Sequence, residues 1–387
     1  MSENDVETPS EAERHANNLE LFLDLVFVFA ITQIATLISH QPTGTGTAKG
    51  LLMTLLVWWQ WSQFTWAGSV VDLQSHTRTR VLVLCCIPIT LIMTVSIPEA
   101  FHSTGIWFGV AYLGVQLMVL GMQGAIALTD PITRPAFIRY ASIAAIAPFA
   151  VMIGGFAHDN VRIIIWVVAV TLFIAGGLNA ANGEWVINAS HFAERHSLFV
   201  IISLGEVLVA AGASATDIGL ERITAAALVV AVAVACMFWW MYFAYIPKVG
   251  EHVLHNAHGP QRGVLARDLF TFIHSALVFG MVLFAVVVKH LIPHPEGHLT
   301  QDDRWLLALS VLFFAGGLSA FQYRVMRRVS PERLLCIPAV AALCVAGAWL
   351  PGLVVIATVA VLLFVAQALT MRRFRGGIHA WHVSSSQ

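Results

Sequence analysis

Long apolar runs, separated by short polar or turn-forming segments, dominate this sequence from residue 19 onward. A bilayer's hydrocarbon core is about 30 Å thick and needs roughly 17 to 25 apolar residues at helical rise. In lipid the backbone must also satisfy its own hydrogen bonds, which favours helices. We therefore predict an all-α polytopic integral membrane protein with about 12 transmembrane helices. The predicted helices are 19–38, 50–71, 81–97, 105–128, 140–156, 163–181, 197–213, 223–246, 269–288, 305–323, 334–350 and 352–371, the last two forming a helical hairpin.

The composition excludes a soluble globular protein. Of the 387 residues 58% are hydrophobic and 11% are charged, whereas about 25% charged residues is usual in soluble proteins. The formal net charge of -1 gives no electrostatic reason to expect a nucleic acid partner. All five cysteines lie in apolar runs, so we interpret them as small buried residues and predict neither disulfides nor a zinc site.

Basic residues alternate between the predicted connections. Sixteen of the 21 Lys and Arg residues lie in the two tails and the even-numbered connections. Because cytoplasmic loops carry an excess of Lys and Arg, we predict a bacterial inner (plasma) membrane protein with both termini cytoplasmic. The predicted segments are a cytoplasmic polar tail (1–18), a first transmembrane half (19–181), a cytoplasmic connection (182–196), a second transmembrane half (197–371) and a cytoplasmic basic tail (372–387). The basic tail predicts contact with anionic membrane lipids.

The two halves contain weak signs of a parallel six-plus-six repeat. Two pairs of similar segments support it, namely 21–22 with 198–199 and 58–61 with 239–242. The closest internal match, however, pairs 172–180 with 312–320 and is out of register. Its Gly-Gly centre is also a general device for close helix packing, so we favour reuse of that device and leave the repeat open.

Ionisable residues inside a membrane are costly and mark candidate functional sites. Asp24 lies near the start of the first predicted helix, and Glu206 lies near the middle of the seventh. We interpret both as lining a proton or substrate path, with Glu206 as proton carrier or cation ligand. The alternative is a paired carboxylate that only ties helices together. His274 of the ninth predicted helix is a candidate proton relay, or else an interior hydrogen-bonding residue.

The segment 188–196 is unusually polar for this chain and contains His191, Glu194 and Arg195. Together with Glu20 these residues are candidates for a cytoplasmic gate or ion pair. A helix cap with a salt bridge is the simpler interpretation, and we favour it slightly over a ligand site.

The second predicted helix is rich in tryptophan, and its candidate aromatic residues are Trp58, Trp59, Trp61 and Trp66. Such residues either pack and anchor the helix or form a cavity wall for an organic cation or apolar substrate.

Sixteen histidines raise the question of a metal site. The candidate groups are His252, His255 and His258, and His290, His294 and His298. Proline and glycine interrupt the second group, the two groups fall on opposite predicted faces, and neither has a cysteine partner. We therefore interpret them as surface residues and predict no metal and no cofactor. The sequence also contains no nucleotide-binding fingerprint and no nucleophile elbow.

Two segments resemble the bacterial low temperature requirement protein A family, namely NLELFLDLVFVFA at 18–30 and ERHSLFVIISLGE at 194–206. The family's first motif typically has a second phenylalanine where this chain has Leu23. The tryptophan-rich second helix, the aromatic motif 239–243 and His274 also fit the family pattern. The resemblance carries no secure activity, but it places five residues in signature segments, namely Glu20, Asp24, Glu194, Arg195 and Glu206.

Three functions remain open. We favour a secondary transporter or proton-linked permeation protein for an unknown small molecule or ion, with Asp24 and Glu206 lining its path. The alternative is an intramembrane enzyme that acts on a lipid or isoprenoid by carboxylic acid and aromatic–cation chemistry. The third is a membrane scaffold or stress-adaptation protein in which the acids only lock helices.

Overall fold

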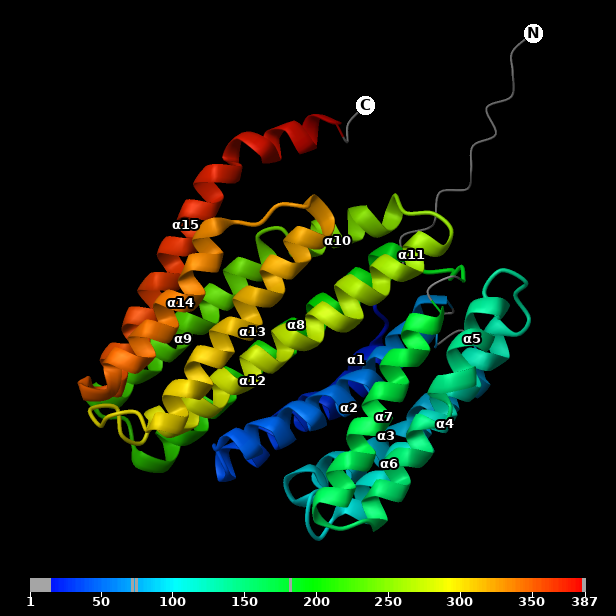
Figure 1. The fold of residues 1–387 in the computed structure, drawn as a ribbon, viewed down its shortest axis with the longest axis horizontal. Helices are drawn as coiled ribbons and strands as arrows, with labels where there is room; N and C mark the ends of the chain where they lie inside the picture. The colour runs from blue at the N-terminus through cyan, green and yellow to red at the C-terminus, as the bar shows by residue number, and fades with distance from the viewer. Residues whose placement is uncertain (1–14, 71–72, 74–75, 181–182, 385–387) are drawn as a thin grey trace.

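The structure is a computed structural model that describes residues 15–70, 73, 76–180 and 183–384. Across these residues every regular element is a helix, apart from one isolated bridge between His298 and Pro351. The predicted all-α fold is therefore confirmed (Figure 1). The first group of elements is α1 (Asn18–His40), α2 (Gly44–Val70), α3 (Thr77–Val95), η1 (Ile97–Glu99), α4 (Gly105–Ala127), α5 (Arg134–Ala144), α6 (Ala147–Phe156) and α7 (Asp159–Asn179). The second group is α8 (Ala189–Ile218), α9 (Arg222–Phe243), α10 (Ile246–His255), α11 (Pro260–Leu265), the π-helix η3 (Ala266–Ile273), α12 (His274–Leu291), α13 (Gln301–Met326), α14 (Pro331–Ala346), η4 (Gly347–Trp349) and α15 (Gly352–Ser384).

Within the described residues, 11 helices are long and apolar enough to cross a membrane. They correspond to eleven of the predicted spans, and a multi-pass membrane protein follows from them. Helix α2 matches the remaining prediction and has 27 residues, but polar side chains such as Gln60 and Gln63 in its middle lower its hydropathy. The count of twelve therefore stays a prediction.

Several helices begin or break at positions that differ from the predicted ones. Helix α8 begins at Ala189, eight residues before the expected start, because the Asn188 side chain accepts a hydrogen bond from the backbone N–H of His191 and caps it. Pro148 and Pro247 stand at the beginnings of α6 and α10. Proline fits a first helical turn but interrupts a continuing helix. The predicted helix 140–156 therefore becomes α5 with α6, whereas the predicted helix 223–246 corresponds to α9, and α10 follows it in a segment that was predicted to be a connection.

The predicted hairpin at the end of the chain is confirmed. Pro351 separates η4 from α15, and the two long helices run back along each other. At the far end of this hairpin the Arg373 Nε of α15 donates to Glu332 Oε1 of α14 at 2.7 Å.

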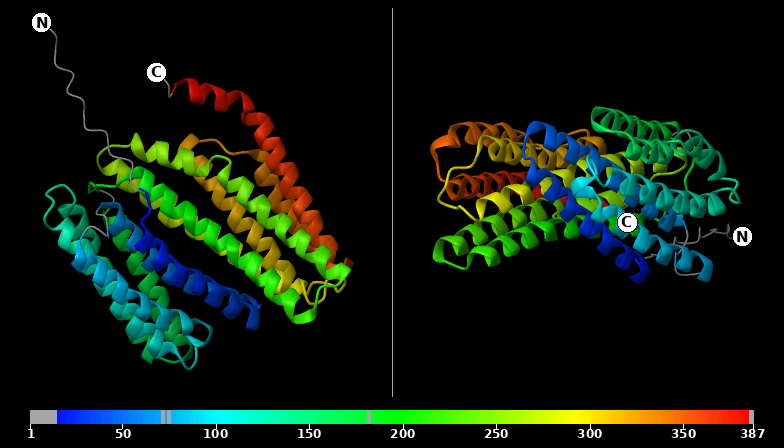
Figure 2. Two further views of the ribbon diagram at one scale, coloured as in Figure 1. Left: turned by 180° about the vertical axis from the view of Figure 1, so that it is seen from behind. Right: turned by 90° about the horizontal axis from the view of Figure 1, so that it is seen from below.

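Helices α1–α7 and α8–α15 form two groups that lie side by side (Figures 1 and 2). They meet where α1 and α2 pack against α8 and α12. Helix α12 is buried along almost its whole length, because α1 and α2 cover one side of it and α8 and α13 cover the rest. The predicted internal repeat is not tested by this arrangement and stays a prediction.

Helices α1, α8 and α12 run in the same direction at this junction. Glu20 contacts His191, and Asp24 contacts Arg195, with the same separation of 171 residues in both pairs. A constant separation means that the two helices are parallel. Farther along α8, Glu206 contacts Lys289 near the end of α12. Most of the predicted site residues lie on these three helices. We call the contact region between α1, α8 and α12 the seam.

Glycine allows several of these helices to approach closely. A Cβ atom on Gly280 of α12 would lie 2.8 Å from the Ser310 carbonyl oxygen and 2.9 Å from the Phe314 nitrogen of α13. In the Gly-Gly motif of α7, Gly176 is also closely packed, since a Cβ atom there would lie 2.8 Å from Ala144 Cβ of α5. Gly316, by contrast, has open space beside it. Close packing through small residues is typical of membrane helices.

Candidate functional site

The first part of the site lies where α1 and α8 begin. Asn17 caps α1 by accepting from the Glu20 backbone N–H, and the Glu20 carboxylate in turn accepts from the Asn17 N–H. Asn188 caps α8 in the same manner by accepting from the His191 N–H. The two capped residues then meet, since His191 Nε2 lies 3.0 and 3.1 Å from the two carboxylate oxygens of Glu20. Both side chains are buried.

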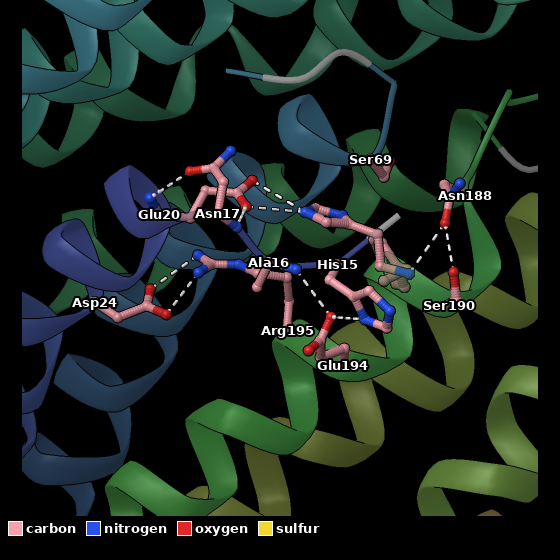
Figure 3. Close-up of polar contacts among 12 residues, drawn as sticks. His15, Ala16, Asn17, Glu20, Asp24, Ser69, Asn188, Ser190, Glu194 and Arg195 are labelled. Carbon is pink, nitrogen blue, oxygen red and sulfur yellow. Dashed lines mark hydrogen bonds and ion pairs between the residues drawn. The ribbon is translucent and has the colours of Figure 1, made fainter. Parts of the chain in front are cut away.

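One turn farther along, Asp24 and Arg195 form a bidentate ion pair (Figure 3). The two guanidinium nitrogens donate to the two carboxylate oxygens at 2.6 and 2.8 Å. Trp61 Nε1 also donates to Asp24 Oδ1 at 2.9 Å, and its ring lies 5.7 Å from the guanidinium carbon. Two charges are stable in such a buried place only when paired and hydrogen-bonded. We call Glu20, Asp24, His191 and Arg195 the start cluster.

Glu194 precedes Arg195 in the chain but contacts a different segment. Its Oε2 atom accepts from the Ala16 backbone N–H at 2.8 Å and lies 3.2 Å from His15 Nδ1 (Figure 3). This carboxylate therefore ties α8 to the residues just before α1. Because consecutive residues on a helix point about 100° apart, Glu194 and Arg195 serve separate partners.

The second part of the site surrounds Glu206, in the middle of α8. Thr32 Oγ1 donates a short hydrogen bond to Glu206 Oε2. The other oxygen, Oε1, accepts no hydrogen bond from the residues that the structure describes and has Lys289 Nζ at 3.5 Å. Lys289 Nζ also donates to Thr36 Oγ1 at 3.4 Å. We call Thr32, Thr36, Glu206 and Lys289 the Glu206 cluster.

Burial differs sharply between the two charges of the Glu206 cluster. The Glu206 side chain is 1% exposed, whereas that of Lys289 is 21% exposed. The lysine therefore reaches inward from the rim of the bundle while the carboxylate stays inside. Long lysine side chains adopt this arrangement because their methylene groups pack against apolar surface.

Aromatic side chains separate the two clusters. Asp24 and Thr32 are eight residues apart on α1, which corresponds to about 12 Å along the helix. Phe27, also on α1, is fully buried between them and contacts Phe64 with ring centroids 6.2 Å apart. On α8, Phe199 packs on Trp61 at 4.3 Å. The aromatic side chains of Phe27 and Phe199 therefore lie at a level between the two clusters.

His274, the first residue of α12, has both ring nitrogens engaged. Its Nδ1 donates to the Leu269 carbonyl oxygen at 2.8 Å, since a carbonyl can only accept. Its Nε2 then accepts from the Tyr242 hydroxyl at 2.8 Å. His196 packs against it at 5.3 Å between ring centroids and has an Nε2 atom without a hydrogen-bond partner. A neutral His274 satisfies both of its hydrogen bonds.

Each of the four candidate tryptophans donates its indole N–H within the bundle. Besides the bond from Trp61 to Asp24, Trp58 donates to the Thr271 carbonyl oxygen at 2.6 Å, and Trp66 donates to Thr271 Oγ1 at 3.1 Å. Trp59 donates to the Tyr140 hydroxyl at 3.2 Å. A cavity of about 30 Å³ lies beside Trp58 and Trp59, which is room for about one water molecule.

The histidine groups hold no metal-type cluster: across the described ranges, no three His, Cys, Asp or Glu residues gather in that way. His290 differs from the predicted surface residue, because its ring bonds to Ser39 and Asp303. The sequence interpretation also missed Lys289 and Thr32. Lys289 and His290 directly follow a long apolar run, and Thr32, Thr36 and Ser39 recur at helical spacing on α1. Those two patterns were the available signals.

Comparisons with known proteins agree with the signature segments. The family described as bacterial low temperature requirement A protein (LtrA) matches residues 15–368. An uncharacterized protein of Rhizobium meliloti (strain 1021) is 29% identical over 327 residues, which are 81% of this chain and 78% of the relative. No solved structure matches the chain. Since the family match spans nearly the whole chain, including both clusters, this protein belongs to the bacterial low temperature requirement A family.

Proposed function

We propose that this protein is a secondary transporter or proton-linked permeation protein in which Glu206 takes up and releases the transported proton or cation. One observation carries the proposal. Glu206 is buried in the middle of a membrane-spanning helix. Its Oε1 atom has no hydrogen-bond partner among the described residues and has the Lys289 ammonium group at 3.5 Å. A carboxylate oxygen that is placed in this way is available to a proton or a small cation.

Lys289 supplies the counter-charge that such a cycle needs. A buried carboxylate without a compensating charge is costly by several kcal/mol. The Lys289 ammonium group lowers that cost while Glu206 is ionised and holds no proton or cation. When Glu206 binds a proton, the attraction on Lys289 is lost. The partial exposure of Lys289 allows its ammonium group to turn outward at that moment.

The start cluster is the proposed gate at the other end of the seam, and Asp24, which we expected to line the path, belongs to this gate because it is bound to Arg195. It locks α1 to α8 through two buried polar pairs, and the layer around Phe27 and Phe199 closes the way to Glu206. Passage of a substrate therefore requires α1 to move relative to α8. A protein with a site between helices that open alternately fits the general mechanism of secondary transporters.

We further propose that the protein lies in the bacterial inner membrane with both termini in the cytoplasm. The alternation of basic residues along the chain supports this orientation. A reporter enzyme that is active only in the cytoplasm, fused after residue 387, tests it directly. Activity of the fusion is expected, and an inactive fusion of the inserted protein contradicts the orientation.

Proton flux into liposomes tests the role of Glu206. Full-length protein is reconstituted around a pH-sensitive dye, and flux is followed under a pH gradient and under a membrane potential. Glu206→Gln removes the titratable group while keeping the shape, so at least a tenfold loss of flux is expected. Asp217→Asn is the matched control, because Asp217 lies on the same helix but is exposed. Equal flux through wild type and Glu206→Gln contradicts the proposal.

A further inference from the structure

A Ser–His–Asp arrangement lies at the end of the seam where α1 and α12 finish. His290 Nε2 is 2.8 Å from Ser39 Oγ, and His290 Nδ1 is 2.5 Å from Asp303 Oδ1. The three residues come from α1, from α12 and from the first turn of α13. Neither the start cluster nor the Glu206 cluster includes them.

The direction of each hydrogen bond follows from the chemistry of the partners. A carboxylate oxygen accepts, so the Nδ1 atom of His290 carries the hydrogen that faces Asp303. In the neutral imidazole, Nε2 then carries a lone pair, to which the Ser39 hydroxyl donates. A hydroxyl that donates to a neutral imidazole is placed to lose its proton to that imidazole.

Asp303 is itself held in place on its second oxygen. Thr300 Oγ1 donates to Asp303 Oδ2 at 2.6 Å and accepts from the Asp303 backbone N–H at 3.1 Å, which caps α13. The carboxylate is nearly buried at 5% exposure, whereas the imidazole is 24% exposed. Nucleophilic acyl transfer requires a carboxylate that holds the histidine in position and a histidine that the substrate can reach. Asp303 and His290 are arranged in this way.

We propose that Ser39 is a nucleophile, His290 its general base and Asp303 the residue that positions His290, and that the site cleaves acyl esters of lipids at the membrane surface. The location supports a lipid ester as substrate. Ser39 lies in the last turn of a membrane-spanning helix, and the exposed Trp305 follows Asp303 by two residues. Tryptophan at a helix end is typical of the level of the lipid headgroups and ester linkages.

The reaction balances with these groups and water. Ser39 Oγ forms a bond to the ester carbonyl carbon while His290 Nε2 takes the hydroxyl proton. The bond from that carbon to the alcohol oxygen breaks, and the proton passes from Nε2 to the leaving alcohol. Water, activated by the same nitrogen, then attacks the acyl-serine and releases the fatty acid, which restores the Ser39 hydroxyl.

Labelling with a fluorophosphonate probe tests the nucleophile. The probe's phosphorus–fluorine bond breaks as Ser39 Oγ bonds to phosphorus, and peptide mass spectrometry locates the added group. We expect labelling of the wild-type chain at Ser39 and none of Ser39→Ala. Thr45→Ala is the control, because Thr45 is an exposed hydroxyl residue just beyond α1, and it is expected to label like wild type. Absence of label on wild-type Ser39, while a serine hydrolase in the same sample is labelled, overturns the proposal.

The base and the positioning residue have separate readouts. His290→Gln is expected to slow labelling by about 100-fold or more, because the proton acceptor is gone. Asp303→Asn is expected to slow it at least tenfold, with partial recovery in Asp303→Glu. Thermal unfolding of every variant is measured, so that a slow rate in a folded protein is distinguished from loss of the fold. A His290→Gln protein that labels at the wild-type rate contradicts the assignment.

The transport proposal is separable from this one. Glu206→Gln removes the group proposed to carry the proton and leaves Ser39, His290 and Asp303 in place, so it is expected to label normally. Hydrolysis of phospholipid vesicles by wild type but not by Ser39→Ala would establish the ester as substrate. Labelling of Ser39 without release of fatty acid from any phospholipid vesicle would overturn the lipid ester assignment.

Discussion

Glu20 and His191 occupy the same place, the third residue, in two parallel helices, and their side chains bond to each other at 3.0 Å. Each helix is capped by an asparagine just before it, Asn17 for α1 and Asn188 for α8. The two helix starts are therefore level, and the positive ends of both dipoles face the same side. The carboxylate of Glu20, in the first turn of α1, offsets part of that charge.

The ion pair between Asp24 and Arg195 gives the first prediction. Replacing one partner leaves a buried charge without compensation, so Asp24→Asn is expected to lower the free energy of unfolding by about 3 to 5 kcal/mol. The double variant Asp24→Leu with Arg195→Met removes both charges and is expected to recover much of the loss. Thermal unfolding of detergent-solubilised protein measures both. Glu194→Gln, at a partly exposed side chain, is the control, and an Asp24→Asn protein as stable as wild type would contradict the buried pair.

The Glu206 cluster gives a second prediction, on coupling. Glu206→Gln and Lys289→Gln are expected to be non-additive, because each single change leaves the other group without its charge partner. A double-mutant cycle on the free energy of unfolding is expected to give a coupling of about 0.5 to 3 kcal/mol. Additive effects of the two substitutions would show that the 3.5 Å contact carries no energy.

Arg162 gives a third prediction, about the turns that join α3 to α4 and α6 to α7. Its guanidinium group is buried. It donates to five backbone carbonyl oxygens, those of Ala100, His102, Gly154, Gly155 and Ala157. Arg162→Met leaves these acceptors without that donor. A loss of about 3 kcal/mol or more in unfolding free energy is expected, since hydrogen bonds to charged groups contribute about 1.5 to 3 kcal/mol each.

Hydrogen exchange followed by mass spectrometry localises the effect of Arg162→Met. Faster exchange is expected in the segments around residues 97–104 and 154–160, where the freed carbonyl groups lie. Arg304→Met is a matched control, because the Arg304 guanidinium group donates to the carbonyl oxygen of Leu299. Similar losses of unfolding free energy in Arg162→Met and Arg304→Met would contradict a special role for the five carbonyl groups around Arg162.

The glycines of α12 and α13 give a fourth prediction. Gly280→Ala places a methyl group 2.8 Å from the Ser310 carbonyl oxygen, so the helices must separate, at an expected cost of about 1 to 3 kcal/mol. Gly316→Ala is the control on α13, where a Cβ atom meets nothing within 4 Å. That change is expected to be neutral or slightly stabilising, because alanine loses less backbone entropy than glycine. Equal unfolding midpoints for the two variants would rule out the close contact.

Much of the fold was predictable because membrane helices are encoded locally. A run of apolar residues long enough to cross a bilayer specifies a helix without reference to the rest of the chain, and eleven such helices are present among the described residues. The terminal hairpin was also predictable locally, because Pro351-Gly352 is a turn signal between two apolar runs. Asp24 and Glu206 were recognisable as unusual because an acid within an apolar run is costly wherever the helix packs.

The partners of those acids were decided only by the tertiary structure. Glu20 and His191 are 171 residues apart, and Ser39 and His290 are 251 residues apart, so no local pattern links them. Hydrophobic periodicity specifies which segments are helical but not which helices lie side by side, because all of them present similar apolar surfaces. Packing of α1, α8 and α12 in one direction brings Lys289 to Glu206 and His290 to Asp303 and Ser39. The sequence therefore determined the helices and the unusual acids, whereas close packing among helices selected which polar groups meet.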